Sequence, residues 1–95
     1  MAQDSIEAAR WLQKAAEQGE ITAFMMLGRM HADGEGVPQD YAVAAELYSQ
    51  SAGMGEPMSQ YSLALMYIEG QGVPVDSTIA VKWLRKSAER GFASA

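Results

Sequence analysis

The chain has 95 residues, of which 48% are apolar and 20% charged, with a formal net charge of −5; this composition is ordinary for one small folded domain. It has no cysteine, which excludes both a disulfide framework and a thiolate metal site. No apolar run approaches the roughly 18 residues of a membrane span, and the first residues lack the cationic start and apolar stretch of a signal peptide. We therefore expect a soluble chain without membrane insertion, and its cellular location stays open.

The basic residues are unevenly distributed along the chain. Arg29 is the only lysine or arginine between Ala15 and Val81. Four more cations follow close together near the C-terminus: Lys82, Arg85, Lys86 and Arg90. Recognition of a phosphate backbone draws on several cations on one surface, and an acidic body repels that ligand, so nucleic acid is not an expected partner. We interpret the C-terminal cations as a solvated helix face at the negative end of the helix dipole.

The first predicted helix covers residues 5–18. Asp4 precedes it as the expected N-cap, and Glu7 follows three residues later, as in a capping box. Apolar and small side chains recur along one face at helical spacing: Ala8, Trp11, Leu12 and Ala15. The helix is expected to end before Gly19.

The second predicted helix covers residues 21–33 and ends at a glycine turn. One of its faces carries Phe24, Leu27, Gly28 and His31. Gly34 and Gly36 form the turn, because glycine enters positive φ without steric cost and can end a helix within a few residues. Pro38 then prevents the helix from continuing.

Three more helices follow in the same manner. The third is predicted over residues 41–54, with Asp40 as its N-cap, and its apolar stripe consists of Ala44, Leu47, Tyr48 and Ser51. The fourth covers residues 61–69 and places Leu63, Ala64 and Tyr67 on one face. A second glycine turn leads through Pro74 to the N-cap Asp76 and into the fifth helix, over residues 77–90. Its stripe consists of Ala80, Trp83, Leu84 and Ser87.

The two glycine turns are copies of each other, displaced by the 36 residues that separate Gly34 from Gly70. A period between about 20 and 50 residues indicates a solenoid, whose units bury their apolar faces against one another. We divide the single domain, 1–95, into a half repeat (1–19), two repeats (20–55 and 56–91) and the start of a further one (92–95). Each repeat has a first helix, A, and a second helix, B. The predicted fold is all-α: a right-handed α/α solenoid of antiparallel helix pairs with five helices.

Residue size predicts how these helices pack. Small residues are expected where two helices cross closely: Ala8, Gly28, Ala44, Ala64 and Ala80. Trp11, Leu47 and Trp83 are expected to fill the space between layers. Met30 and Met66 recur in register and are assigned to the core, whereas Met25, Met54 and Met58 are candidates for an adaptable binding surface.

No arrangement of residues indicates catalysis. The sequence shows neither a nucleophile with its base, nor paired carboxylates in a cleft, nor a cluster of metal ligands, so we predict no enzyme, no catalytic residue, no metal site and no cofactor. His31 is the only histidine; Tyr67 occupies its position in the next repeat, which favours a packing or hydrogen-bonding role. The Gly-x-Gly pairs follow helices and lack a Gly-Lys-Ser or Gly-Lys-Thr, so they are turns and not a nucleotide-binding loop.

The constrained positions resemble the Sel-one-like (SLR) subclass of tetratricopeptide-related repeats. In the first repeat they are Ala23, Leu27, Gly28, His31, Gly34, Gly36, Val37, Asp40, Ala44, Leu47 and Gly55. In the second they are Leu63, Ala64, Tyr67, Gly70, Gly72, Val73, Asp76, Ala80, Trp83, Lys86, Ala88 and Gly91. His31 stands where the family usually has tyrosine, and Leu47 where it has tryptophan or another aromatic residue. The resemblance covers essentially the whole chain.

The resemblance implies a binding groove on the concave side, lined by the A helices. Its ligand-facing positions correspond to Met25, Arg29, Ala32 and Asp33 in the first repeat and to Tyr61, Leu65, Ile68 and Glu69 in the second. Met58 is added as a candidate. Independently, Tyr61, Leu65 and Ile68 form a second apolar stripe, which indicates either a binding surface or packing against a neighbouring A helix.

We therefore expect a non-catalytic adaptor that binds a peptide or a partner protein in this groove. Asp33 and Glu69 predict a partner with basic and apolar character. A structural spacer of a longer solenoid, which associates weakly end to end, is an alternative from another class. A helical-repeat reader of single-stranded RNA is a further one, although its basic groove is missing.

Overall fold

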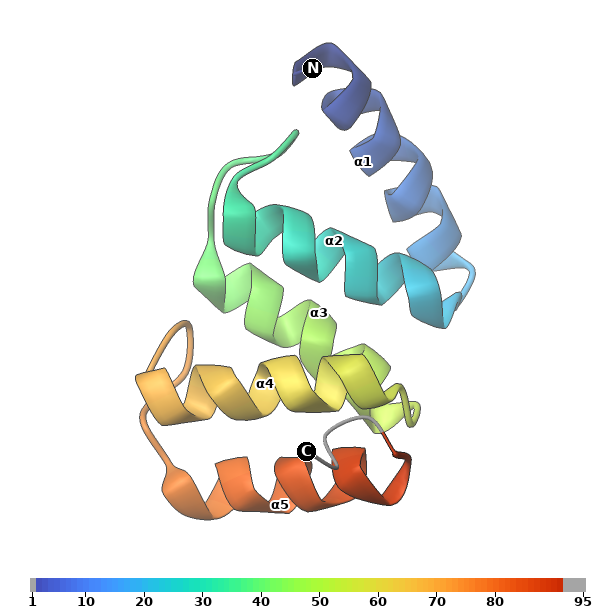
Figure 1. Ribbon diagram of the computed structural model, residues 1–95. Coiled ribbons are helices and arrows are strands. Elements are labelled where there is room, and N and C mark those ends of the chain that lie inside the picture. Colours follow the sequence, from blue (N-terminus) through green and yellow to red (C-terminus); the bar gives the residue numbers. More distant parts are fainter. Residues whose placement is uncertain (1, 92–95) are drawn as a thin grey trace.

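The structure is a computed structural model that describes residues 2–91. Within this range the chain forms five helices and no strand: α1 (Ala2–Glu17), α2 (Ile21–Asp33), α3 (Tyr41–Gly53), α4 (Pro57–Glu69) and α5 (Ser77–Glu89). Figure 1 shows them as a stack in chain order, from α1 at the top to α5 at the bottom. Each helix packs on the next one along the chain. The predicted all-α solenoid is confirmed, with α2 and α4 as A helices and α1, α3 and α5 as B helices.

The two glycine turns have the same geometry. Gly34 and Gly70 end α2 and α4 at φ 71 and 72, in the left-handed region, where glycine avoids the strain that other residues incur. Their amides donate to the carbonyl oxygens of Met30 and Met66, at 2.7 Å in both cases. The turn then returns the chain antiparallel to the A helix, and the next helix begins at its aspartate.

The N-caps at the B helices are confirmed for α3 and α5 but not for α1. The Asp40 carboxylate accepts from the amides of Ala42 and Val43 at 3.0 and 3.2 Å, and that of Asp76 accepts from the Ile79 amide at 3.1 Å. The prediction of Asp4 as an N-cap is wrong, because α1 already begins at Ala2 and Asp4 lies in its first turn. There its carboxylate still interacts favourably with the helix dipole.

Helix boundaries differ from the predicted ones by a few residues. The B helices end at Glu17, Gly53 and Glu89, one residue earlier than predicted. The fourth helix begins four residues earlier than predicted, at Pro57, a residue that fits the first turn of a helix because it has no amide hydrogen to satisfy. The Glu56 side chain caps this end by accepting from the Ser59 amide at 2.7 Å.

The core lies around α3, the middle helix. Its buried cluster consists of Ala44, Ala45, Tyr48, Ala52, Leu63 and Met66. Gly28 is needed for close packing, since a Cβ there would lie 3.1 Å from Cε1 of Tyr48. Met66 is 5% exposed, as predicted, whereas Met30 is only half-buried.

The expected packing of α1 is wrong at two positions. Trp11 is 72% exposed and Ala8 is exposed as well, although the residues equivalent to Ala8, namely Ala44 and Ala80, are 0% and 1% exposed. In α3 and α5 this side of the helix packs on the A helix that precedes it, whereas α1 is the first helix of the stack.

No helix within residues 2–91 is long and apolar enough to cross a bilayer.

Candidate interaction surface

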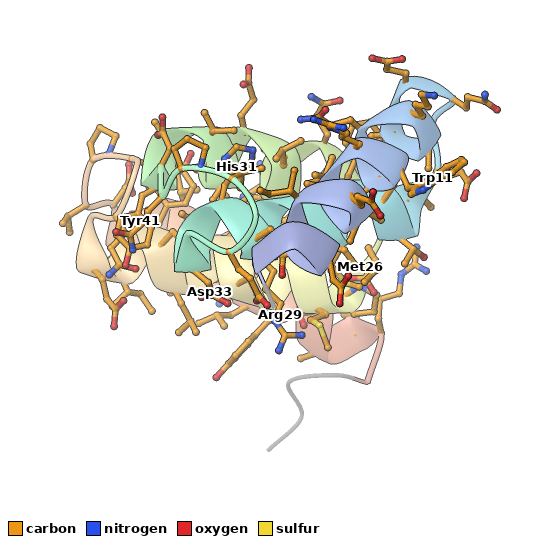
Figure 2. All side chains as sticks on the ribbon, turned by 90° about the horizontal axis from the view of Figure 1, so that it is seen from above. Trp11, Met26, Arg29, His31, Asp33 and Tyr41 are labelled. Carbon is orange, nitrogen blue, oxygen red and sulfur yellow. The ribbon has the colours of Figure 1, made fainter. Side chains whose placement is uncertain are left out.

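The nine predicted groove residues lie on the two A helices. Helix α2 supplies Met25, Arg29, Ala32 and Asp33, and α4 supplies Met58, Tyr61, Leu65, Ile68 and Glu69. We call these nine residues the A-helix face. Met25, Ala32 and Tyr61 are half-buried and the other six are exposed. Figure 2 shows Arg29 and Asp33 on the same side of the molecule, together with Met26, whereas His31 lies on the opposite side.

Two of the nine residues also serve the fold. Met25 and Ala32 pack against the core cluster around Tyr48. A substitution of either residue would therefore change stability as well as any binding on this face. The side chains that can be altered with little effect on the core are those at the exposed positions.

The two helices give the A-helix face two different halves. On α4, Met58, Leu65 and Ile68 are 41%, 37% and 47% exposed. On α2, the position equivalent to Leu65 is Arg29 and the position equivalent to Ile68 is the half-buried Ala32. The α4 half is thus apolar and the α2 half is polar, while an acidic residue, Asp33 or Glu69, ends each helix.

Tyr48 brings a hydroxyl group from the B helix α3 to the polar half. Its side chain is 8% exposed, and its hydroxyl forms a hydrogen bond with Ser62 of α4. Burial raises the pKa of Tyr48 above 10.0, and the negative charge of Asp33 raises the pKa further; the Arg29 charge and the Ser62 hydrogen bond act in the opposite direction.

Sequence reasoning placed Tyr48 in the core stripe and missed its polar end. A signal was present, since the equivalent positions in the other B helices are Leu12 and Leu84. Leucine is sufficient for packing there, so the additional hydroxyl marks a difference specific to the middle of the stack.

Sequence reasoning also did not identify Met26 as an exposed methionine. Its side chain is 45% exposed and lines a shallow hollow between α1 and α2, together with Ala8, Leu12 and Arg29. Met54, a predicted surface methionine, is 43% exposed and is the C-cap residue of α3.

His31 has the structural role predicted for it. Its Nδ1 donates to the carbonyl oxygen of Pro38 at 3.3 Å and so ties α2 to the glycine turn that follows. Within residues 2–91 no group of three or more histidine, cysteine, aspartate or glutamate side chains could hold a metal ion. The described surface thus offers exposed apolar and charged side chains for contact with a partner.

Comparison with protein families gives one match, to the Sel1 repeat, over residues 1–20, 24–56 and 57–92. The matched segments together cover nearly the whole chain and correspond to α1, to α2 with α3, and to α4 with α5. No match was found among curated proteins.

Solved structures with similar folds include three bacterial repeat proteins, each with a TM-score of 0.85. The protective antigen c5321 of uropathogenic Escherichia coli, which displays an SLR fold, is 49% identical over 86% of this chain. A Sel1 repeat protein from Oxalobacter formigenes is 35% identical over 87%, and cysteine-rich protein B of Helicobacter pylori is 27% identical over 90%. This chain spans 18%, 63% and 64% of their respective lengths.

Proposed function

Since this chain belongs to the Sel1 repeat family, whose members generally mediate protein–protein interactions, we propose that it binds a peptide or partner protein on its A-helix face. The family is typically a non-catalytic repeat scaffold. In this proposal the chain acts as an adaptor, and the A-helix face provides the contact.

The observation that supports this proposal most is the second apolar face of α4. Helix α4 packs on α3 and on α5 and buries Leu63, Ala64 and Met66. Leu65 and Ile68 nevertheless remain 37% and 47% exposed. Single exposed apolar residues are common on protein surfaces, but two at helical spacing, with Met58 about two turns earlier on the same helix, provide apolar anchors for a partner.

Charge defines the chemistry of the proposed partner. Asp33 and Glu69 are both exposed and are the last residues of α2 and α4, so each A helix ends in an acidic group on the proposed surface. A segment that carries lysine or arginine beside apolar side chains complements this arrangement, and an acidic competitor is repelled. Arg29 adds an exposed hydrogen-bond donor in the α2 half.

Selection from a random peptide library tests both the surface and the partner chemistry. We expect enriched peptides to combine basic and apolar residues, and their affinity to weaken as salt concentration rises. Backbone amide shifts of the labelled chain should change at Arg29, Leu65 and Ile68 when such a peptide is added. Enrichment of acidic or phosphorylated peptides would contradict the proposed charge complementarity, and tight binding of poly-U RNA would instead support an RNA-binding repeat.

A further inference from the structure

The amide group of Gln60, in the first turn of α4, is only partly satisfied by hydrogen bonds. The side chain is 4% exposed, and its Nε2 donates to the carbonyl oxygen of Ala52 at 3.1 Å. This bond fixes the orientation of the amide, because an oxygen in the place of Nε2 would face another acceptor. Within residues 2–91 the buried Oε1 accepts no hydrogen bond. Buried acceptors are nearly always paired, so the structure calls for a donor at this place.

Gln60 lines a hollow that lies between three helices. The end of α3 and the turn after it form one wall, the start of α4 forms another, and the last two turns of α5 form the third. The hollow has a volume of about 300 Å³, at the lower end of the range of about 300 to 1,000 Å³ that is typical of small-molecule sites. It shares no residue with the A-helix face.

Helix α5 brings charges of both signs to this hollow. The Lys86 ammonium lies 5.3 Å from the centre of the Trp83 ring, a favourable position over an aromatic face. The Arg90 guanidinium lies against the turn between α3 and α4, since a Cβ on Gly55 would be 2.7 Å from its Nη2. Glu89 adds a carboxylate to the lining. The hollow therefore combines two cations and one anion with the unpaired acceptor.

The preceding repeat lacks these polar groups at the equivalent positions, 36 residues earlier. Phe24 takes the place of Gln60, and the three charged positions of α5 correspond on α3 to Gln50, Gly53 and Met54. Phe24 is 9% exposed, so an apolar side chain meets the packing requirement there. The acceptor and the charges are thus a feature of the second repeat that packing alone does not require.

We propose that this hollow binds a free α-amino acid. The carboxylate of the ligand is bound by Lys86 and Arg90, and its ammonium group donates to Oε1 of Gln60 and to the Glu89 carboxylate. A zwitterion complements both signs of charge and the unpaired acceptor. A simple anion would leave Oε1 without a donor, and Glu89 would repel it. This binding site is independent of the A-helix face, so either proposal can fail without the other.

Titration of the isotope-labelled chain with glycine, L-serine, L-glutamate and L-leucine, followed by nuclear magnetic resonance, tests the proposal. We expect saturable binding of one molecule per chain for at least one of these four. The largest shifts should occur at the side-chain amide of Gln60 and at the backbone amides of Gly55 and Arg90. The N-acetyl derivative of the best ligand lacks the ammonium group and the C-terminal amide lacks the carboxylate, so both should bind roughly tenfold or more weakly.

Two variants of the chain test the assigned contacts. Arg90→Gln removes an exposed cation of the hollow and should weaken binding roughly tenfold or more. Arg85→Gln is the matched control, because Arg85 is an exposed residue of α5 that does not line the hollow, and it should bind as the unmodified chain does. Gln60→Leu removes the acceptor and places an apolar side chain there, as Phe24 does in the preceding repeat, and should also weaken binding.

Circular dichroism of each variant verifies that the chain is folded, and Arg90→Gln together with the ligand derivatives tests the site without any change in the core. Absence of saturable binding by all four amino acids, equal weakening by Arg85→Gln, or full affinity in a folded Gln60→Leu variant would overturn the proposal. Full affinity of the N-acetyl derivative would overturn it as well, because it would identify the C-terminus of a peptide as the ligand.

Discussion

Trp11 and Trp83 occupy equivalent positions in the first and last helices, two repeats apart, yet their surroundings differ. Each ring has a lysine ammonium above it, Lys14 at 5.5 Å and Lys86 at 5.3 Å from the ring centre. Trp83 nevertheless packs against the core cluster, while Trp11 is 72% exposed. Within residues 2–91, Trp83 has an A helix, α4, before it in the stack and Trp11 has none. In a solenoid, burial is therefore decided by the neighbouring repeat as much as by the residue itself.

The largest difference between equivalent positions should appear on truncation of the two tryptophans. Trp83→Ala removes a side chain that packs on the core and should lower the free energy of unfolding by about 2 to 5 kcal/mol. Trp11→Ala should change it by no more than about 0.5 kcal/mol, as an exposed substitution does. Urea unfolding followed by circular dichroism measures both. Equal losses would show that Trp11 is buried in solution.

The glycine turns allow a similar comparison between a packed and an open position. Gly72 and Gly19 have φ values of 76 and 84, but a Cβ on Gly72 would collide with the Tyr41 backbone, whereas one on Gly19 would meet nothing within 4 Å. Gly19→Ala should cost about 1 to 2 kcal/mol, from backbone strain alone. Gly72→Ala should cost more, because the turn must also move away from α3. Thermal unfolding of the two variants measures the difference, and equal midpoints would contradict the close contact.

Substitution of the aspartates at the starts of α3 and α1 should distinguish N-capping from an interaction with the helix dipole. Asp40→Ala removes an acceptor for two backbone amides and should cost about 0.5 to 2 kcal/mol. Asp4→Ala removes a charge from the first turn of α1 and should cost about 0.3 to 1 kcal/mol, an effect that added salt reduces. A comparison of the two variants at low and high salt measures this. A loss for Asp4→Ala that is larger and independent of salt would restore Asp4 as a cap.

The smallest expected effect on the free energy of unfolding concerns Tyr48 and is detectable in alkaline solution. Because its folded-state pKa is raised above 10.0, its contribution to stability is fully present below that pH and is lost as the pH rises through the folded-state value. Tyr48→Phe, which retains the ring, should therefore flatten the decline in stability above pH 10. Denaturant midpoints between pH 8 and 11 provide the measurement. An unchanged slope would mean that Tyr48 is as accessible as an ordinary surface tyrosine.

Local rules were sufficient to predict the helices and turns of this fold. Gly34 and Gly70 each end an A helix, and Asp40 and Asp76 each start a B helix, through contacts within a few residues. The exposure of Trp11 and Ala8 could not be predicted in this way, because it depends on whether another helix packs there. The polar end of Tyr48 was missed because helical periodicity assigns a whole side chain to one face. Pro57 was not used to start α4, although its missing amide hydrogen is suited to that position.

The central claim is that α4 presents a binding surface on the side that does not support the fold. Its most direct test is the affinity of a library-selected peptide for a Leu65→Ala, Ile68→Ala double variant, measured by isothermal titration calorimetry beside Leu63→Ala. We predict that the double variant retains its helical circular dichroism and loses affinity about tenfold or more, whereas Leu63→Ala loses about 2 to 5 kcal/mol of stability through cavity formation. Full affinity in a folded double variant would contradict the claim.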